Sequence, residues 1–370
     1  MPNIGKRKLR KIRVLYVIDS LGLGGAEKLL LSTLKAMPQV EPFVVYLHQD
    51  DRLLPLFSNY KTNYVPFEGN LFKVFYAVWL LKKMIRQNRI ELVHAHLYWS
   101  TIIGRLSTPK VIPFISTYHS VMYNANEAAY SFILKMMDFM TYSSRHFTIS
   151  VSDVVKRHLS EKLKIRHNSF VLHNFIEDVF FECSNKLEKH IRPLKGAKLK
   201  MVSVGNIKPA KNYDFYVDII AQTDNLVWDI YGGDPGTKRS LARAIQKNDC
   251  KNIRLRGIEN NIYEVLTQYD VFFMPSRWEG FGLALVEAMA SRIPCIVSNI
   301  EVFKEVAGHN GAFFINLDNI KAFKEGVEFV EKGGIALKEM VEIAYEKSKE
   351  YRKKTHVEKL VRLYTLALNQ

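Results

Sequence analysis

Two glutamates, Glu279 and Glu287, lie in the stretch SRWEGFGLALVEAMA, residues 276–290. The second half of this stretch is apolar except at Glu287, which predicts a buried helix. An unpartnered buried carboxylate is costly, so we expect Glu287 to have a partner. Carboxylates only accept hydrogen bonds and suit ligands rich in hydroxyl groups, such as sugars and ribose. The amides of Gly280 and Gly282 could meet the same ligand.

Two lysines follow a strand-like run in SVGNIKPAKN, residues 203–212. Lys208 and Lys211 precede a predicted helix, and lysines beside helix N-terminal amides suit a diphosphate. The alternative is a pair of solvated lysines on a loop. The next strand ends in another glycine loop at Gly232, and Arg256 precedes a further helix, where it could wall a nucleotide base.

A glycine loop also follows the first predicted strand, in DSLGLGGAEK. Gly22, Gly24 and Gly25 permit close approach to the backbone, and the helix that begins there offers free N–H groups to an anion. A tight turn without a ligand is the alternative. The glycine spacing is not G-x-G-x-x-G and no acidic residue ends the second strand, so the loop does not support nicotinamide binding.

Three histidines end neighbouring strands of the first half. His94 and His96 lie on one side of a strand, and His119 ends the next. Histidines at this spacing can bind metal. No Asp/Glu/Cys cluster accompanies them and the chain has no D-x-D, so we expect no metal site; the histidines either pack in the core or line a ligand site.

These residues require a scaffold in which short strands alternate with helices, which predicts α/β domains with parallel sheets. Strands are expected at 12–19, 42–48, 91–96, 113–119, 146–152, 200–206, 226–232, 252–257, 270–276 and 294–299. Helices are expected at 25–37, 72–88, 127–144, 213–223, 237–248, 282–291 and about 338–367.

The polar segment 182–196 is the expected linker between two doubly wound, Rossmann-like domains that face a cleft. The first should span 1–181 and the second 197–350, with the C-terminal helix, about 351–370, packing back on the first. In such sheets ligands bind beyond the carboxyl ends of the strands, where all the residues above lie.

The E-x7-E pattern EGFGLALVE followed by AMASRIPCIVS resembles the signature of the retaining GT-B glycosyltransferases of family 4. The resemblance covers nearly the whole chain, in the family's order: GLGGAEK, ELVHAH, STYHS, VLHNFIE and SVGNIKPAKN. It implies a GT-B fold and transfer of a sugar from a nucleotide diphosphate sugar, UDP- or GDP-linked, to an acceptor hydroxyl with retained configuration.

The resemblance also implies roles for single residues. Glu279 would face the donor sugar, Glu287 would hold the ribose and Lys211 the diphosphate, while His119 would lie near the transferred sugar; His119, Glu279 and Lys211 are the catalytic candidates. The remaining donor-binding candidates are Gly24, Gly25, Gly205, Asn206, Lys208, Gly232, Arg256, Gly280, Phe281, Gly282 and Leu283. Asn206 departs from the family, which often has arginine there, and Lys208 would supply the missing charge.

The mechanism implied needs no metal or other cofactor, because lysines and helix N-termini would stabilise the departing diphosphate. Domain closure would exclude water. The expected acceptor is a lipid-linked saccharide used in the synthesis of a surface polysaccharide, glycolipid or cell-wall glycan, and it would contact the first domain.

Charge and composition agree with a phosphate-bearing partner. The 370-residue chain has a net charge of +16, and residues 1–180 carry 24 lysines and arginines against 13 acidic residues. No nucleic-acid module is recognisable, so nucleic-acid binding is not expected. Three distant cysteines fit a reducing cytoplasm. No apolar run reaches the ~20 residues of a membrane span.

Residues 71–89 predict an amphipathic helix with a basic end, carrying Phe72, Phe75 and Trp79. It either faces the core with solvated lysines or docks the protein on the cytoplasmic face of an anionic membrane. A nucleotide-sugar epimerase or another non-transferase enzyme on the same fold, such as a phosphorylase, is the alternative to a transferase.

Overall fold

The computed structural model describes residues 11–121, 128–182, 198–233, 238–317 and 319–370. Contacts divide the chain into two compact units. The first contains the chain through His173 together with His356–Gln370, and the second contains Asn174–Thr355. The sequence placed the first boundary at 181, and residues of the predicted linker beyond Glu182 lie outside the described ranges.

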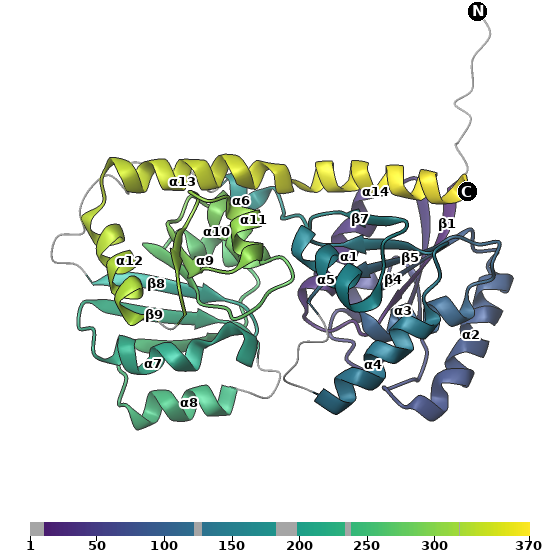
Figure 1. Ribbon diagram of the computed structural model, residues 1–370, viewed down its shortest axis with the longest axis horizontal. Coiled ribbons are helices and arrows are strands. Elements are labelled where there is room, and N and C mark those ends of the chain that lie inside the picture. The colour runs from purple at the N-terminus through teal and green to yellow at the C-terminus, as the bar shows by residue number, and fades with distance from the viewer. Residues whose placement is uncertain (1–10, 122–127, 183–197, 234–237, 318) are drawn as a thin grey trace, which may run out of the picture. The chain divides into compact units, whose positions relative to one another are not determined.

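The first unit has a parallel seven-stranded sheet of order β3-β2-β1-β4-β5-β6-β7 (Figure 1). Its strands are β1 (Ile12–Ile18), β2 (Val40–Tyr46), β3 (Lys61–Tyr64), β4 (Leu92–His96), β5 (Phe114–Tyr118), β6 (Phe147–Ser150) and β7 (Ser169–Val171). Its helices are α1 (Gly25–Ala36), α2 (Val74–Gln87), α3 (Tyr98–Ser107), α4 (Ala128–Thr141), α5 (Asp153–Leu163) and most of α14 (Lys353–Leu368).

Both faces of this sheet are covered, because successive side chains of a strand point to opposite faces. Tyr16 and Ile18 of β1 pack in the cluster that contains Leu360 and Tyr364 of α14. Val17 packs on the other face, in the cluster supplied by α2 and α3. The last helix of the chain is therefore part of the first unit's core.

The second unit has a parallel six-stranded sheet of order β10-β9-β8-β11-β12-β13. Its strands are β8 (Leu199–Val204), β9 (Leu226–Tyr231), β10 (Ile253–Gly257), β11 (Val271–Met274), β12 (Cys295–Ser298) and β13 (Phe313–Ile315). Its helices are α6 (Val179–Glu182), α7 (Tyr213–Ala221), α8 (Lys238–Lys247), α9 (Ile262–Leu266), α10 (Leu283–Ala290), α11 (Glu301–Ala307), α12 (Ile320–Lys332) and α13 (Ile335–Ser348).

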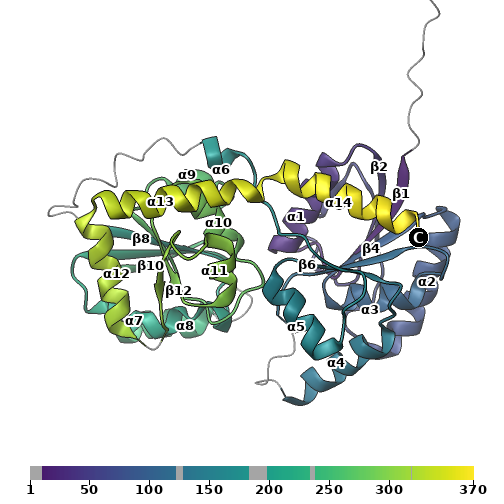
Figure 2. The ribbon, with the colours of Figure 1, turned by 45° about the horizontal axis from the view of Figure 1, so that its top comes forward.

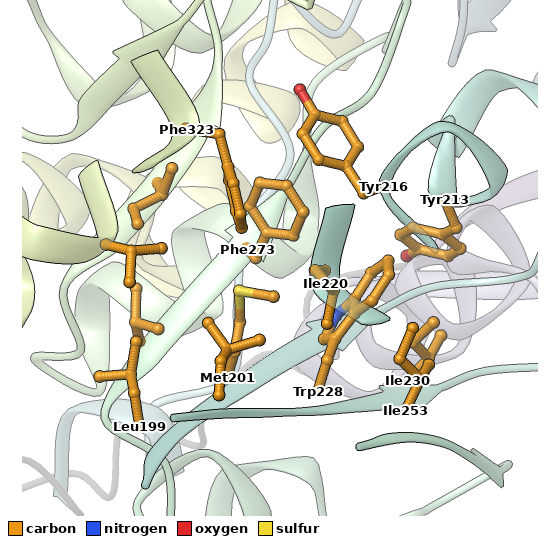
Figure 3. Packing of buried hydrophobic residues seen from close by; sticks show 14 of the residues in the cluster. Leu199, Met201, Tyr213, Tyr216, Ile220, Trp228, Ile230, Ile253, Phe273 and Phe323 are labelled. Atoms are coloured by element: carbon orange, nitrogen blue, oxygen red, sulfur yellow. The ribbon is translucent and has the colours of Figure 1, made fainter. Parts of the chain in front are cut away.

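One core cluster of this unit is rich in aromatic side chains (Figure 3). Tyr216 of α7 meets Phe273 of β11 at a ring-centroid distance of 4.9 Å, and Trp228 of β9 lies 5.7 Å from the same phenylalanine ring. The Trp228 indole N–H donates to Ser203 Oγ at 2.8 Å, which satisfies its polar atom inside the core. This packing fixes β8 and β11, the strands that carry the loops described below.

The expectation of one continuous helix over 338–367 is wrong. α13 ends at Ser348, a short 3-10 turn spans Lys349–Tyr351, and Arg352 is extended before α14 begins. Ile176 bridges this extended residue, and Lys353 pairs with Glu177 at 2.6 Å. Phe180 and Phe181, which follow, are buried in the second unit, so residues 174–181 belong with it rather than with the first.

None of the helices in the described ranges is both long and apolar enough to cross a bilayer.

Candidate functional site

The strand order of the second unit reverses between β8 and β11, because β8 begins the series and has both β9 and β11 as neighbours. In open parallel sheets a crevice forms outside the carboxyl ends of the strands at such a switch point, and ligands bind there. The loops at these ends are 205–212 after β8 and 275–282 after β11. They hold most of the residues singled out in the sequence.

Lys211 and Glu279 meet at this switch point. Lys211 Nζ lies 2.8 Å from Glu279 Oε1, and the side chains are 13% and 18% exposed. Ser276 Oγ donates to the same carboxylate oxygen at 2.8 Å. The site thus holds a cation and an anion that are both largely buried and whose charges balance each other.

Two further contacts join the loops. The Arg277 backbone N–H donates to the Ala210 carbonyl at 2.7 Å, and Arg277 Nε donates to Asn212 Oδ1 at 2.9 Å. Asn212 is buried in the left-handed conformation, at φ 55°, between the 3-10 turn that carries Lys211 and α7. Ser276, Arg277 and Asn212 were not assigned roles from the sequence, although each flanks a residue that was.

The glycines at the strand ends allow the loops to pack closely. Gly205 has φ +143°, and a Cβ there would lie 2.9 Å from Lys211 Nζ. A Cβ on Gly232 would lie 2.0 Å from the Gly205 carbonyl oxygen. Larger residues at either position would displace the lysine or separate the strand ends. Asn206 Oδ1 accepts from Gly233 N at 3.1 Å, which ties the two glycine loops together.

The neighbouring Lys208 is exposed, and among the described residues no carboxylate pairs with its ammonium group. It therefore differs from Lys211, which is held. The charge that Asn206 lacks is available on the same loop.

Glu287 lies on the half-buried edge of α10. The helix buries Leu285, Val286, Ala288, Met289 and Ala290, whereas Leu283 and Glu287, one turn apart, are both partly exposed. The expectation that this helix is buried on every side is wrong at that edge. α10 begins after Gly282, and the buried Phe281 ring packs on Tyr351 with centroids 5.2 Å apart. Gly280 lies in the same loop.

Arg256 lies on the edge strand β10, on the same side as Arg254. Arg256 Nε donates to Asp229 Oδ2 at 3.0 Å and Arg254 Nε to Oδ1 at 2.6 Å. Tyr269 also donates to Asp229, at 2.5 Å. The Arg256 side chain is thus bound to a buried carboxylate. The next residue, Gly257, contacts the glycine loop after β9, because its carbonyl accepts from Gly232 N at 2.7 Å.

In the first unit the order of strands reverses between β1 and β4. Gly24 and Gly25 begin α1 at this point. A Cβ on Gly24 would lie 2.1 Å from Glu27 Oε2, and Glu27 Oε1 accepts from Ser20 Oγ at 3.1 Å. Burial raises the pKa of Glu27. Glu27 was not selected as a site residue from the sequence. Its position in the first turn of a helix that follows two glycines could have indicated it.

The three histidines converge at the ends of β4 and β5, as the strand pattern indicated, but they differ in role. His94 is in the core, with Nδ1 2.7 Å from the Tyr364 hydroxyl of α14 and Nε2 2.7 Å from Thr117 Oγ1. His96 Nδ1 lies 3.2 Å from His119 Nε2. His96 is buried, whereas His119 is half-buried.

Desolvation keeps these rings neutral. Burial lowers the pKa of His94 to about 3 and that of His119 to about 4. A neutral imidazole with one nitrogen held by a neighbour has a single nitrogen left for a ligand. Of the predicted site residues, His119, Gly24 and Gly25 belong to the first unit and the others to the second.

Two family models match the chain, one on each half. The model described as Glycosyltransferase Family 4 matches residues 23–179, and the model described as Glycosyl transferases group 1 matches residues 185–347. Together they leave out only the ends and a short internal segment.

Curated relatives carry transferase names. The chain is 27% identical over 262 residues to UDP-Gal:alpha-D-GlcNAc-diphosphoundecaprenol alpha-1,3-galactosyltransferase of Escherichia coli, covering 66% of this chain and 67% of that one. It is 47% identical over 179 residues to the O-antigen chain mannosyltransferase RfbU of Salmonella typhimurium, covering 47% and 45%.

A solved structure shares the fold. HepE of Anabaena, crystallised in complex with UDP and glucose, superposes with a TM-score of 0.76 at 15% identity, covering 96% of this chain and 99% of that one. At this identity the similarity shows the two-domain GT-B architecture.

Proposed function

The chain belongs to the GT-B glycosyltransferases, and we propose that it moves a sugar from a UDP- or GDP-sugar to an acceptor hydroxyl with retention of anomeric configuration. The observation that carries the proposal is the Lys211–Glu279 pair at the switch point of the second unit. A cation for a diphosphate and an acceptor for sugar hydroxyls lie side by side there, in a largely buried position.

In the proposed donor complex Lys211 binds the diphosphate, with Lys208 as the second cation. Because Lys211 then shares its charge with the diphosphate, the Glu279 carboxylate can accept hydrogen bonds from hydroxyls of the donor sugar. Glu287 accepts from the ribose. The close-packed backbone at Gly205 lets the diphosphate approach the strand ends. The other donor contacts that we propose in the second unit are Asn206, Gly232, Arg256, Gly280, Phe281, Gly282 and Leu283. Gly24 and Gly25 stay the donor-binding candidates of the first unit.

In the transfer step the bond between the sugar C1 and the diphosphate oxygen breaks, and its electron pair leaves with the nucleotide diphosphate. A new bond forms from the acceptor oxygen to C1 on the same face. The acceptor proton passes to an oxygen of the leaving phosphate. Lys211 and Lys208 stabilise the charge that develops on the leaving group, which is an electrostatic contribution to the rate. No metal ion is required in this proposal.

The acceptor contacts the first unit, with His119 beside the transferred sugar. Glu27 and Asp50 flank the glycine loop, since a Cβ on Gly24 or Gly22 would collide with their carboxylates. Two carboxylates can accept hydrogen bonds from the hydroxyl groups of a saccharide acceptor. The name of the Escherichia coli relative supports a saccharide on a lipid diphosphate as the acceptor class. We place the reaction in the cytoplasm, and the free, buried Cys250 and Cys295 fit that compartment.

The test is a two-stage assay with the full chain. Thermal shifts with UDP-, GDP- and ADP-sugars identify the donor, because a ligand that binds the folded state raises the melting temperature. Nucleotide release is then followed with and without lipid-linked saccharides, and proton NMR of the product reports the anomeric configuration. We expect release to depend on the acceptor, to persist with a chelator, and to give the donor's configuration. Interconversion of donor sugars without an acceptor would show an epimerase instead.

A further inference from the structure

Helix α4 is amphipathic, but its acidic residue faces the protein interior and its apolar residues face solvent. It turns Asp138 to the inside, at 0% exposure, and leaves apolar side chains in water. The exposed residues are Phe132 (63%), Ile133, Met136, Phe139 and Met140 (76%). A surface helix of a globular protein normally shows the opposite pattern, and contiguous exposed apolar residues mark interaction surfaces.

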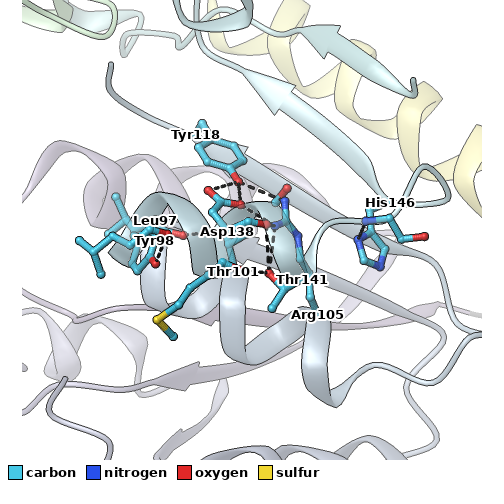
Figure 4. A network of polar contacts seen from close by, with 12 residues as sticks. Leu97, Tyr98, Thr101, Arg105, Tyr118, Asp138, Thr141 and His146 are labelled. Carbon is cyan, nitrogen blue, oxygen red and sulfur yellow. Dashed lines mark hydrogen bonds and ion pairs between the residues drawn. The ribbon is translucent and has the colours of Figure 1, made fainter. Parts of the chain in front are cut away.

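A buried ion pair holds α4 in this orientation (Figure 4). Arg105 of α3 donates through Nη1 to Asp138 Oδ1 at 2.5 Å, and the side chains are 1% and 0% exposed. The Tyr118 hydroxyl of β5 lies 2.8 Å from both carboxylate oxygens. The Tyr98 hydroxyl donates to the Leu134 carbonyl at 2.7 Å. Rotating the helix to bury its apolar side would break all these contacts, so its apolar face stays outward.

Helix α2 presents a second set of exposed aromatic side chains in the same layer. Its sheet-facing side buries Ala77, Leu81 and Ile85. On the opposite side lie Phe75 (85% exposed), Tyr76 and Trp79. Phe72 (95% exposed) lies in the 3-10 turn, Leu71–Lys73, that leads directly into α2, and it is counted with α2 here. Both views show α3 between α2 and α4 on one face of the sheet (Figures 1 and 2). We call the exposed apolar residues of α2 and α4 the two-helix surface.

The charged side chains of α2 and of the residues next to its two ends are all basic. Residues 69–90 contain five basic residues and no acidic one: Lys73, Lys82, Lys83, Arg86 and Arg89. No ion pair to these five appears among the described residues. On α4 the one acidic side chain, Asp138, is neutralised inside by Arg105, while Lys135 is partly exposed. The two-helix surface is thus apolar and bordered by free cations.

We propose that the two-helix surface docks the protein on an anionic lipid bilayer, with α4 as well as α2 inserted at the interface. Aromatic and aliphatic side chains enter the boundary between headgroups and acyl chains, and lysines and arginines bind the negative headgroups. A second copy of this chain fits less well, because a two-fold interface would bring like cations together. The proposal gives a physical basis for the lipid-linked acceptor proposed above, but its chemistry does not depend on that reaction.

The experiment measures sedimentation of the full chain with vesicles of phosphatidylcholine alone or with roughly 30% phosphatidylglycerol. We expect binding at least about tenfold tighter to the anionic vesicles, weakened by salt. Phe139→Ser/Met140→Ser on α4 and Phe72→Ser/Phe75→Ser on α2 should each reduce binding about tenfold or more. Ile335→Ser, a similarly exposed isoleucine of the second unit, is the matched control and should leave binding unchanged.

Circular dichroism confirms that each variant is folded, and donor binding measured in the absence of vesicles reports on the donor site separately. Absence of vesicle binding, equal binding to neutral and anionic vesicles, or an α4 variant that binds like the control would each overturn the proposal. Concentration-dependent dimerisation abolished by the same serine variants would assign the surface to a second copy. Vesicle binding without donor binding would retain this proposal and refute the proposed function.

Discussion

Lys211 Nζ lies 2.8 Å from Glu279 Oε1, although the two residues are on different loops after different strands. The strand order produces this meeting, because β8 and β11 are neighbours in the sheet and their loops open at the same end. Backbone and side-chain bonds from Arg277 then hold the loops together. The pair compensates both charges in this largely buried position.

Replacing Lys211 tests its proposed role toward the diphosphate. A charge-assisted hydrogen bond contributes about 1.5–3 kcal/mol, so Lys211→Gln should weaken donor affinity roughly 10- to 150-fold. The measurement is isothermal titration with the donor found in the thermal screen. The control is Lys321→Gln, which changes an exposed lysine paired only with Glu325. Unchanged affinity in the Lys211 variant would remove this residue from the donor site.

Glu287 is tested by a cycle that combines a variant with an altered nucleotide. Glu287→Ala should weaken nucleotide affinity about tenfold, since one strong hydrogen-bond acceptor is lost. Deleting the ribose hydroxyls should weaken binding to the natural protein by a similar factor and have little effect on the variant. If the two changes are additive, Glu287 does not bind the ribose.

The buried histidines predict a pH dependence of stability. Burial lowers the pKa of His94 to about 3, so between that value and its ordinary pKa of about 6.5 the unfolded chain binds the proton and the folded one does not. The stabilisation is complete above about pH 6.5 and is lost as the pH falls. Each such histidine should cost up to about 2 kcal/mol between pH 6.5 and pH 5.

Urea denaturation at pH 7 and pH 5 measures this loss. His94→Gln should reduce the difference in unfolding free energy between the two pH values, whatever it does to stability at pH 7. His309→Gln is the control, because this histidine of the second unit, next to Gly308, is exposed to solvent. Equal pH dependence in the His94 variant and the natural protein would contradict the assignment.

The Arg105–Asp138 pair predicts a large loss of stability on removal of one partner. Asp138→Ala leaves a guanidinium uncompensated in the core and should lower the unfolding free energy by about 3–5 kcal/mol. Glu325→Ala, which breaks the exposed pair with Lys321, should change it by less than about 0.5 kcal/mol. A small effect of Asp138→Ala would mean that α4 is not held by this pair.

Much of the fold followed from patterns local in sequence. The ten expected strands all occur, because the apolar runs of most of them are buried in parallel sheets. The exception is β10, an edge strand in which only Ile253 is buried. β3, β7 and β13 were not anticipated. These are the short outer strands; β3 alternates exposed and half-buried residues in KTNY, and such a sequence carries no buried-strand signal. The break at Lys349–Tyr351 was missed since a charged, helix-favouring sequence continues through it.

The sequence indicated those site residues that lie at predicted strand ends. It did not indicate which residues far apart in the sequence contact each other. The E-x7-E spacing and loop lysines drew attention to Glu279 and Lys211, but their contact depends on the sheet order. In the sequence Glu27 resembles an ordinary residue of a helix surface. In the structure its carboxylate lies against Gly24 and accepts from Ser20. The buried partner of Asp138 lies on another helix, so the reversed polarity of α4 was not visible in its sequence alone.

In the proposed donor complex the donor binds between the loops after β8 and β11. Hydrogen exchange of the full chain, with and without the donor identified by thermal shift, tests it most directly. We expect slower exchange of backbone amides in residues 205–212 and 276–287 when the donor is bound, and loss of this protection in Lys211→Gln at the same donor concentration. Binding with protection elsewhere and none in these two segments would contradict it.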